Sequence, residues 1–205
     1  MPVSQSRIYL ASRSPRRREL LRQIGVDHEV LMLRAKAPRG RDVNEDPTAG
    51  EDPRDYVMRV CRDKVEAGWN CLLARRLPLR AVLAADTTVC LGTEILGTPA
   101  DAAEAAAFLG RLSGREHEVL TAVALKNQSR MELQLSTTAV RLRTLERAEI
   151  NRYVASGDPM DKAGAYGIQG QAGAFIAEIR GSYSGVMGLP LYETALLLKD
   201  FGLMP

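Results

Sequence analysis

The chain has 205 residues, of which 45% are hydrophobic and 26% charged, and this ordinary globular composition excludes extended disorder. The formal net charge of +3 and the aromatic content of 5% argue against a nucleic-acid-binding module, which needs a basic surface and stacking side chains. The three cysteines form no Cys-x-x-Cys pair, so we expect neither a disulfide framework nor a structural zinc site. No segment approaches the ~20 apolar residues of a membrane span. We therefore expect one cytoplasmic domain over residues 1–205, with no membrane or nucleic-acid partner.

The beginning of the chain predicts a strand, a tight turn and a helix. Residues 8–11 form a short apolar run suited to a buried strand. Ser14 is a good helix N-cap, Pro15 fits the first helical position, and Gly25 ends the helix. Such a helix start presents unpaired backbone N–H groups and the positive end of the helix dipole.

Three arginines occupy the first turn of this helix, where acidic residues are normally favoured. Arg16, Arg17 and Arg18 repel one another and the helix dipole, a cost that is understandable if a polyanion binds there. A phosphate chain is the natural candidate, because it can accept from both the N–H groups and the guanidinium groups. The alternative is that the arginines point into solvent, but three of them after a Ser-Pro cap favour the anion site.

The same stretch resembles a known family. Residues 10–21, Leu-Ala-Ser-x-Ser-Pro-Arg-Arg-x-Glu-Leu-Leu, are similar to the opening signature of the Maf family of nucleoside triphosphate pyrophosphatases.

A second strand is predicted at residues 26–33 and a surface loop at residues 34–50, which are rich in Arg, Pro, Gly and Asp. In the Maf family a similar acidic stretch supplies a carboxylate to the active cleft, and Glu45 is the best match. Residues 35–41 look like an insertion relative to the family pattern. The alternative, a solvated acid on a loop, is nearly as well supported by the sequence.

A helix is predicted to begin at Asp52, because this N-cap is followed by proline and by Val57, Cys61 and Val65 at helical spacing. Lys64 lies close to this apolar face, so its ammonium must either extend outward to solvent or meet an anion. The local pattern alone favours solvent. However, Arg-Asp-Lys-Val resembles the family's Arg-Glu-Lys-Ala, whose lysine contacts phosphate.

Residues 81–85 form a continuous apolar run that predicts a buried central strand, and Asp86 follows directly. A carboxylate in this setting loses hydration unless a cation or several donors compensate, and acids at strand ends in apolar surroundings are typical functional groups. We therefore expect Asp86, at the strand end, to be a catalytic or metal-binding residue. A structural acid that caps a turn is the alternative, but the turn signal at residues 92–93 comes only later. Ala-Ala-Asp-Thr also resembles the family segment whose Asp is the proton acceptor.

Thr98 departs from the family pattern, which usually has a lysine here that is associated with the substrate phosphates. Threonine can donate one hydrogen bond but carries no charge. The departure implies either weaker phosphate binding or compensation by a neighbour such as Arg13, which itself replaces a smaller residue.

The middle of the chain reads as scaffold. Residues 101–113 predict a capped, alanine-rich helix, and residues 119–125 and 133–142 predict two strands joined by a polar turn. Thr144 is the expected N-cap of a further helix that extends to Gly157.

Residues 157–170 are dense in glycine beside Asp161, Lys162, Tyr166 and Gln169, which indicates backbone brought close to a ligand. The segment Asp-Lys-Ala-Gly-Ala-Tyr-Gly-Ile-Gln-Gly closely resembles the Maf subgroup that acts on thymidine and uridine triphosphates. The subgroup that acts on 7-methyl-GTP typically lacks both the Asp-Lys pair and the Ile-Gln-Gly. Residues 181–191 are also family-like and lead into a last apolar helix.

The resemblance therefore covers nearly the whole chain. It implies a Maf/ITPase-like α/β fold, in which a mixed, bent β-sheet is flanked by helices and two lobes surround a substrate cleft. It also implies a homodimer and the hydrolysis of dTTP and UTP to the monophosphate and pyrophosphate.

The resemblance also assigns roles to residues. Asp86 would orient or deprotonate the attacking water and, with Glu45, bind a divalent cation, Mg²⁺ or Mn²⁺. The residues expected to hold the triphosphate are Ser14, Arg16, Arg17, Lys64 and Lys162. Those expected to set substrate specificity are Arg16, Thr87 and Gln169. The carboxamide of Gln169 offers a donor and an acceptor that match the O4 and N3–H edge of uracil or thymine.

Two other functions remain open. The substrate could instead be 7-methyl-GTP or a damaged nucleotide. Alternatively, the chain could be a non-catalytic nucleotide-binding regulator of cell division, which the missing lysine at Thr98 makes conceivable. The presence of Asp86 and of the pair Asp161 and Lys162 argues against that function.

Overall fold

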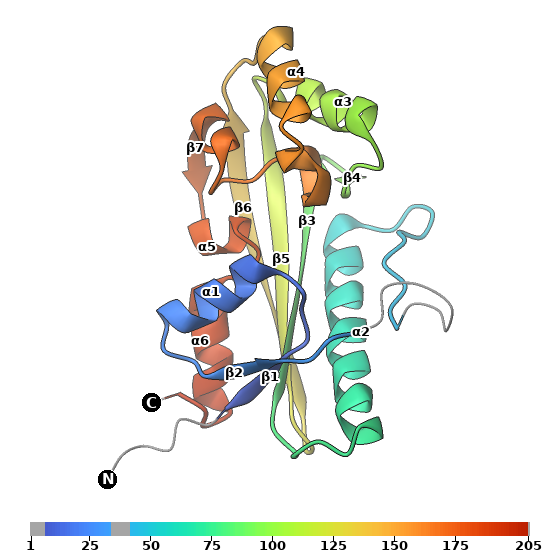
Figure 1. Cartoon of the computed structure of the whole chain (residues 1–205), viewed down its shortest axis with the longest axis vertical. Coiled ribbons are helices and arrows are strands. Elements are labelled where there is room, and N and C mark those ends of the chain that lie inside the picture. The colour runs from blue at the N-terminus through green and yellow to red at the C-terminus, as the bar shows by residue number, and fades with distance from the viewer. Residues whose placement is uncertain (1–6, 34–41, 205) are drawn as a thin grey trace.

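The structure is a computed structural model that describes residues 7–33 and 42–204 (Figure 1). The strands are β1 (Ile8–Leu10), β2 (His28–Val30), β3 (Val82–Leu91), β4 (Glu94–Leu96), β5 (Glu116–Lys126), β6 (Met131–Leu142) and β7 (Ile176–Arg180). The α-helices are α1 (Pro15–Gln23), α2 (Pro53–Ala74), α3 (Ala102–Leu112), α4 (Arg147–Ala155), α5 (Tyr183–Val186) and α6 (Leu191–Asp200). Three short 3₁₀-helices are η1 (Asp158–Asp161), η2 (Ala163–Ala165) and η3 (Gln171–Phe175).

One seven-stranded sheet organises the molecule, in the order β2-β1-β3-β5-β6-β7, with β4 paired to β3. β1 is parallel to both β2 and β3, whereas β5, β6 and β7 continue the sheet in antiparallel fashion. The three longest strands, β3, β5 and β6, run along most of the molecule (Figure 1). The predicted α/β class with a mixed sheet flanked by helices is confirmed.

Helices cover both faces of the sheet and one of its ends. α2 packs on one face through Val57, Cys61 and Val65, and α1 and α6 pack on the other. We call this half, with β1 and β2, the first lobe. A separate apolar cluster joins α3 and α4 to the far ends of the long strands, and we call it, with β4, η1 to η3 and β7, the second lobe.

Three predicted helix caps are confirmed and one is wrong. The side chains of Ser14, Asp52 and Asp101 each accept a backbone N–H in the first turn of their helices. The fourth helix begins after Glu146 rather than after Thr144. The physical reason is that Leu145 is buried and its N–H bonds to Ser113 Oγ at 2.8 Å, which ties this residue to the end of α3 before α4 can start.

The strand predictions place the central elements but miss short ones. The strand expected at residues 26–33 is only β2, and β4, β7 and the 3₁₀-helices were not expected, because such short segments show no clear periodicity. The proposed insertion at residues 35–41 lies outside the described part of the chain. Within residues 7–33 and 42–204, none of the helices has the length and apolarity that a membrane crossing requires.

His117 makes the stability of the fold depend on pH. The residue is 3% exposed, its Nε2 lies 2.7 Å from the Tyr166 hydroxyl, and burial lowers the pKa of its imidazole to about 4. In the unfolded chain the pKa of this histidine is about 6.5, so the unfolded state takes up the proton first and stability falls as the pH drops from about 6.5 to about 4. We expect this residue to contribute a loss of about 3 kcal/mol. Urea unfolding at about pH 7.5 and about pH 4.5 measures the loss, and His117→Gln, which cannot titrate, should reduce it; equal losses in both proteins would contradict the assignment.

Candidate active site

Asp86 lies inside strand β3, not at its end as the sequence suggested. The strand continues to Leu91 because Thr87, Thr88 and Val89 are β-branched and because β3 pairs with β5 along nine successive positions from Val82 to Cys90. The Asp86 side chain therefore projects from the middle of the sheet and is only 7% exposed as a residue. A carboxylate held there requires a cation nearby.

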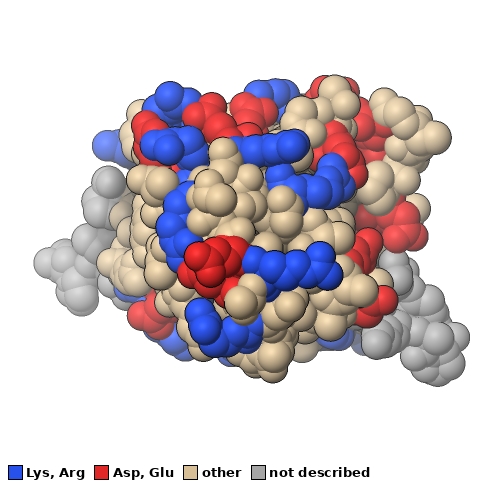
Figure 2. Space-filling view, turned by 90° about the horizontal axis from the view of Figure 1, so that it is seen from above, with Lys and Arg blue, Asp and Glu red and all other residues tan. Residues whose placement is uncertain are grey.

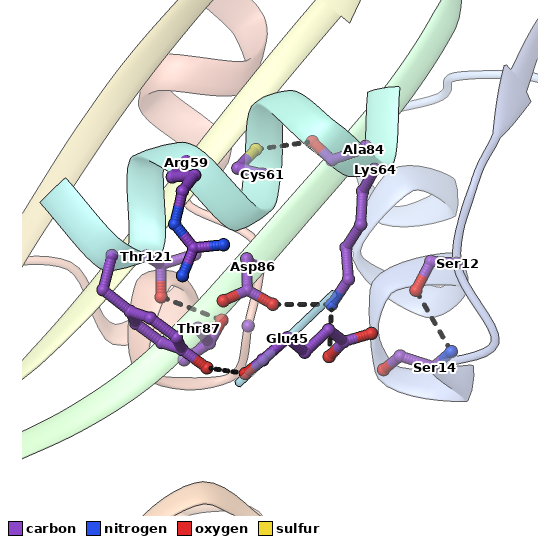
Figure 3. A network of polar contacts seen from close by, with 12 residues as sticks. Ser12, Ser14, Glu45, Arg59, Cys61, Lys64, Ala84, Asp86, Thr87 and Thr121 are labelled. Atoms are coloured by element: carbon purple, nitrogen blue, oxygen red, sulfur yellow. Dashed lines mark hydrogen bonds and ion pairs between the residues drawn. The ribbon is translucent and has the colours of Figure 1, made fainter. Parts of the chain in front are cut away.

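Lys64 of α2 supplies that cation (Figure 3). Its Nζ lies 2.7 Å from Asp86 Oδ1 and 3.0 Å from Glu45 Oε2, and its side chain is 15% exposed. Of the two possibilities for this lysine, the structure therefore selects contact with anions over extension into solvent. It also brings the two predicted metal-binding carboxylates to a common point, although they lie far apart in the sequence.

Arg17 connects the start of α1 to the strand that carries Asp86. Its Nε donates to the Gly188 carbonyl at 2.6 Å, and its Nη2 donates to Thr87 Oγ1 at 3.3 Å. Ser14 Oγ accepts the Arg17 N–H at 3.4 Å and so caps the helix. Burial lowers the pKa of the Arg17 guanidinium, whereas the negative charge of Asp86 raises it. The α1 N-terminus is thereby fixed beside the carboxylate.

The second lobe supplies the opposite wall through η1 and the residues after it. Lys162 Nζ lies 3.1 Å from Asp158 Oδ1 and 2.6 Å from Asp161 Oδ1, and Arg16 of α1 approaches Asp161 at 3.7 Å across the cleft. Burial raises the pKa of Asp158, but hydrogen bonds from Tyr153 and Lys162 outweigh it and hold that pKa below its usual value. The wall is therefore a network of paired charges.

The glycines of this segment allow close packing on side chains of the protein. A Cβ at position 167 would lie 2.7 Å from Lys162 Cε, and one at position 170 would lie 3.0 Å from Asp158 Oδ2. The sequence suggested that these glycines bring backbone close to a ligand. The close contacts of these two glycines are with Lys162 and Asp158, and Gly167 and Gly170 line the same cleft as those side chains.

These walls enclose a cleft of about 470 Å³. All the residues to which the family resemblance assigned a role line it, namely Ser14, Arg16, Arg17, Glu45, Lys64, Asp86, Thr87, Lys162 and Gln169. Thr98 lines it too, but Arg18 and Arg13 do not, and Arg13 donates instead to the Leu33 carbonyl at 3.1 Å. The structure thus gives no support to compensation by Arg13.

Several cleft residues were missed by sequence reasoning. They include Asp158 and the apolar residues Val89, Val119 and Met187. They come from four separate parts of the chain and share no local motif, so only the folded chain brings them together. The residues that line the cleft include four basic and four acidic side chains.

Positive and negative side chains are also mixed on the outer surface. Figure 2 shows Lys and Arg beside Asp and Glu over the face seen from above, and ion pairs of the second lobe such as Arg143 with Glu149 at 2.7 Å are of this kind. A stripe of one sign is not present on that face, in keeping with the low net charge.

The cleft of this mixed α/β fold combines a helix N-terminus, four basic side chains and the carboxylates of Asp86 and Glu45. This arrangement is typical of proteins that bind phosphate chains next to acidic groups. The chain belongs to the Maf-like protein family, whose model matches residues 7–201. This confirms the resemblance found in the sequence.

Similar proteins extend over nearly the full chain. A dTTP/UTP pyrophosphatase of Aromatoleum aromaticum is 60% identical over 98% of this chain and 98% of its own length. Proteins of the same name from Nitrosomonas europaea and Bordetella parapertussis are 56% and 58% identical over 96% of this chain and cover 95% and 93% of their own lengths. Among solved structures, the Ham1 protein of Staphylococcus aureus is similar with a TM-score of 0.42 and 14% identity, over 66% of this chain and 71% of that one.

Proposed function

We propose that this protein hydrolyses dTTP and UTP to the nucleoside monophosphate and pyrophosphate. The observation that carries the proposal is the meeting of Asp86, Lys64 and the α1 N-terminus in one cleft. The names of relatives that are 50% to 60% identical over almost the whole chain support the same substrates.

The basic residues of the cleft are proposed to bind the triphosphate. Ser14, Arg16 and Arg17 lie at the start of α1, and Lys64 of α2 and Lys162, which directly follows η1, line the same cleft. In this structure most of these cations are paired with carboxylates of the cleft, so phosphate oxygens would replace carboxylate oxygens as their acceptors. Positioning and charge neutralisation of this kind supply much of the catalysis in phosphate chemistry.

Asp86 and Glu45 are proposed to hold a divalent cation, Mg²⁺ or Mn²⁺. Groups of three or more His, Cys, Asp or Glu that could bind a metal are absent from the described residues. Two carboxylates that converge on one ammonium nevertheless fit Mg²⁺, which commonly takes one or two carboxylates and completes its shell with water and substrate phosphates. A cation bound there would neutralise charge on the phosphates. Asp86 is proposed to accept a proton from the attacking water.

Specificity for the pyrimidine base is proposed to depend on Arg16, Thr87 and Gln169. Thr87 Oγ1 accepts from Arg17 at 3.3 Å and from Thr121 at 3.1 Å, which fixes its hydroxyl beside the cleft. Gln169 is exposed at the cleft, where its carboxamide can pair with the O4 and N3–H edge of uracil or thymine. We also propose that the protein is a cytoplasmic homodimer, and sedimentation of the purified chain tests the dimer.

Pyrophosphate release from a panel of canonical and modified triphosphates, with Mg²⁺ or Mn²⁺, tests the function. We expect turnover of dTTP and UTP well above that of purine nucleotides. Preferential turnover of 7-methyl-GTP would instead assign the protein to the Maf subgroup that acts on that nucleotide. Binding of nucleotides without any turnover would overturn the proposed enzymatic activity and favour the non-catalytic regulator. The observation behind that alternative is Thr98, which lines the cleft where the family usually has a lysine.

A further inference from the structure

The loop that carries Glu45 requires an explanation, because Glu45 itself is poorly fixed by packing. Its side chain is 52% exposed, yet its carboxylate lies 3.0 Å from Lys64 Nζ, on the same ammonium that binds Asp86. A long, half-exposed side chain samples several rotamers unless its backbone is held in place. The question is therefore what holds the backbone at residues 44–46.

Two side chains of α2 hold that backbone. Arg59 Nη1 donates to the Asn44 carbonyl at 3.3 Å, the Tyr56 hydroxyl donates to the Glu45 carbonyl at 2.9 Å, and Arg59 Nη2 donates to the Asp46 carbonyl at 3.2 Å. Three consecutive carbonyls are thus bonded to side chains one helical turn apart. Figure 3 shows Arg59, Glu45, Lys64 and Asp86 gathered on this side of α2.

Arg59 is itself fixed by a second point on the same loop. Its Nε and Nη2 bond to the two carboxylate oxygens of Glu51 at 2.7 and 2.8 Å, the bidentate geometry that gives arginine its directional strength. Glu51 is 11% exposed at its side chain and also accepts the Thr48 N–H at 3.0 Å. The hydrogen bond from Arg59 lowers the pKa of Glu51 to about 2, so this carboxylate is ionised at neutral pH.

We infer that Arg59, together with Tyr56 and Glu51, is a positioning group that aims the Glu45 carboxylate at Asp86 and thereby sets the affinity of the cleft for a divalent cation. We call these three residues the Arg59 clamp. The inference rests on the proposed function, because it takes Glu45 to be a ligand of that cation. Outer residues that orient metal ligands typically change metal affinity by about 10- to 100-fold when they are replaced.

The test compares Arg59→Met, Tyr56→Phe and Glu51→Gln with Arg62→Met, which makes the same change at an exposed arginine of the same helix. Direct Mn²⁺ binding is measured in the presence of a non-hydrolysable UTP analogue, and the Mg²⁺ concentration for half-maximal turnover is measured separately. We expect Arg59→Met to weaken Mn²⁺ binding and raise the Mg²⁺ requirement by about 10-fold, with Tyr56→Phe and Glu51→Gln giving smaller shifts in the same direction. Turnover at saturating Mg²⁺ should stay within about 2-fold of the unmodified protein, because the clamp does not touch the substrate.

Amide hydrogen exchange over residues 42–51 reports the clamp independently of metal and turnover. Faster exchange there in Arg59→Met, but not in Arg62→Met, together with the loss of Mn²⁺ affinity, supports the inference. Unchanged Mn²⁺ affinity in all three clamp variants would overturn it, and so would unchanged Mn²⁺ affinity in Glu45→Gln. Absence of triphosphate turnover by the unmodified protein would instead overturn the proposed function, and Mn²⁺ binding would still decide the role of the clamp.

Discussion

Replacing Asp86 with asparagine is expected to reduce turnover of dTTP and UTP by about 10³-fold or more, because the amide keeps the shape of the side chain but can neither accept a proton nor carry charge. Loss of a proton acceptor typically costs about 10² to 10⁴ in rate, and this residue also contributes to the proposed cation site. Pyrophosphate release at saturating nucleotide and Mg²⁺ measures the effect.

Glu118→Gln is the matched control for that experiment. Glu118 is an acid of the neighbouring strand β5, but it pairs with Arg54 at 3.1 Å and is not one of the cleft residues. Its replacement should leave turnover within about 2-fold of the unmodified protein. If Asp86→Asn retained a tenth or more of the turnover, another group would have to accept the proton.

Replacing Lys64 with methionine is expected to affect both stability and activity. The change leaves the carboxylates of Asp86 and Glu45 facing a common point without their cation, and an unpaired carboxylate as buried as Asp86 should lower the free energy of unfolding by about 2 kcal/mol or more. Turnover should fall by about 10²-fold or more, because a phosphate-binding charge is lost. Mg²⁺ can bind the two freed carboxylates, so it should raise the melting temperature more in the variant than in the unmodified protein.

Lys126→Met provides the comparison for Lys64→Met. Lys126 also bonds to a carboxylate, that of Glu66 at 2.9 Å, but this acid is 41% exposed. Such a pair contributes about 0 to 1 kcal/mol, and neither residue lines the cleft. Equal losses of stability in the two variants, with no difference in their response to Mg²⁺, would show that Lys64 does not join the carboxylates in a cation site.

Much of the fold could be predicted from local signals. Ser14, Asp52 and Asp101 mark helix starts because a short polar side chain at an N-cap needs only its own first turn. The start of α4 was misjudged because Leu145 is anchored by Ser113, more than thirty positions earlier in the chain. The strand β7 was missed because its five residues show no strict alternation and take their place only through pairing with β6.

The cleft shows the same division between local and long-range information. Asp86 was identified because a carboxylate directly after an apolar run is unusual at the level of sequence, whereas Lys64 was assigned to the site only through the family resemblance. The contacts of Arg59 could not be predicted, since two of its acceptors are backbone carbonyls, which every residue possesses. Asp158 contacts Lys162 and Tyr166 contacts His117 of β5, and only the folded chain shows that these contacts lie beside the cleft.

The long strands under the cleft have a consequence for how the protein can move. β3 and β5 pair without interruption from Val82 to Cys90, and β5 and β6 from Glu116 to Lys126, so the backbone passes from one lobe to the other as a continuous ladder. Hinge bending normally takes place at loops or element ends, and the described sheet offers no such point at the level of Asp86. Bending of the sheet is therefore not expected at the level of Asp86, and adaptation to a nucleotide is expected from side chains at the rim of the cleft, such as the exposed Gln169. We therefore expect the protein to discriminate among bases by the fit of each base to a preformed cleft, not by closure of the two lobes around the nucleotide.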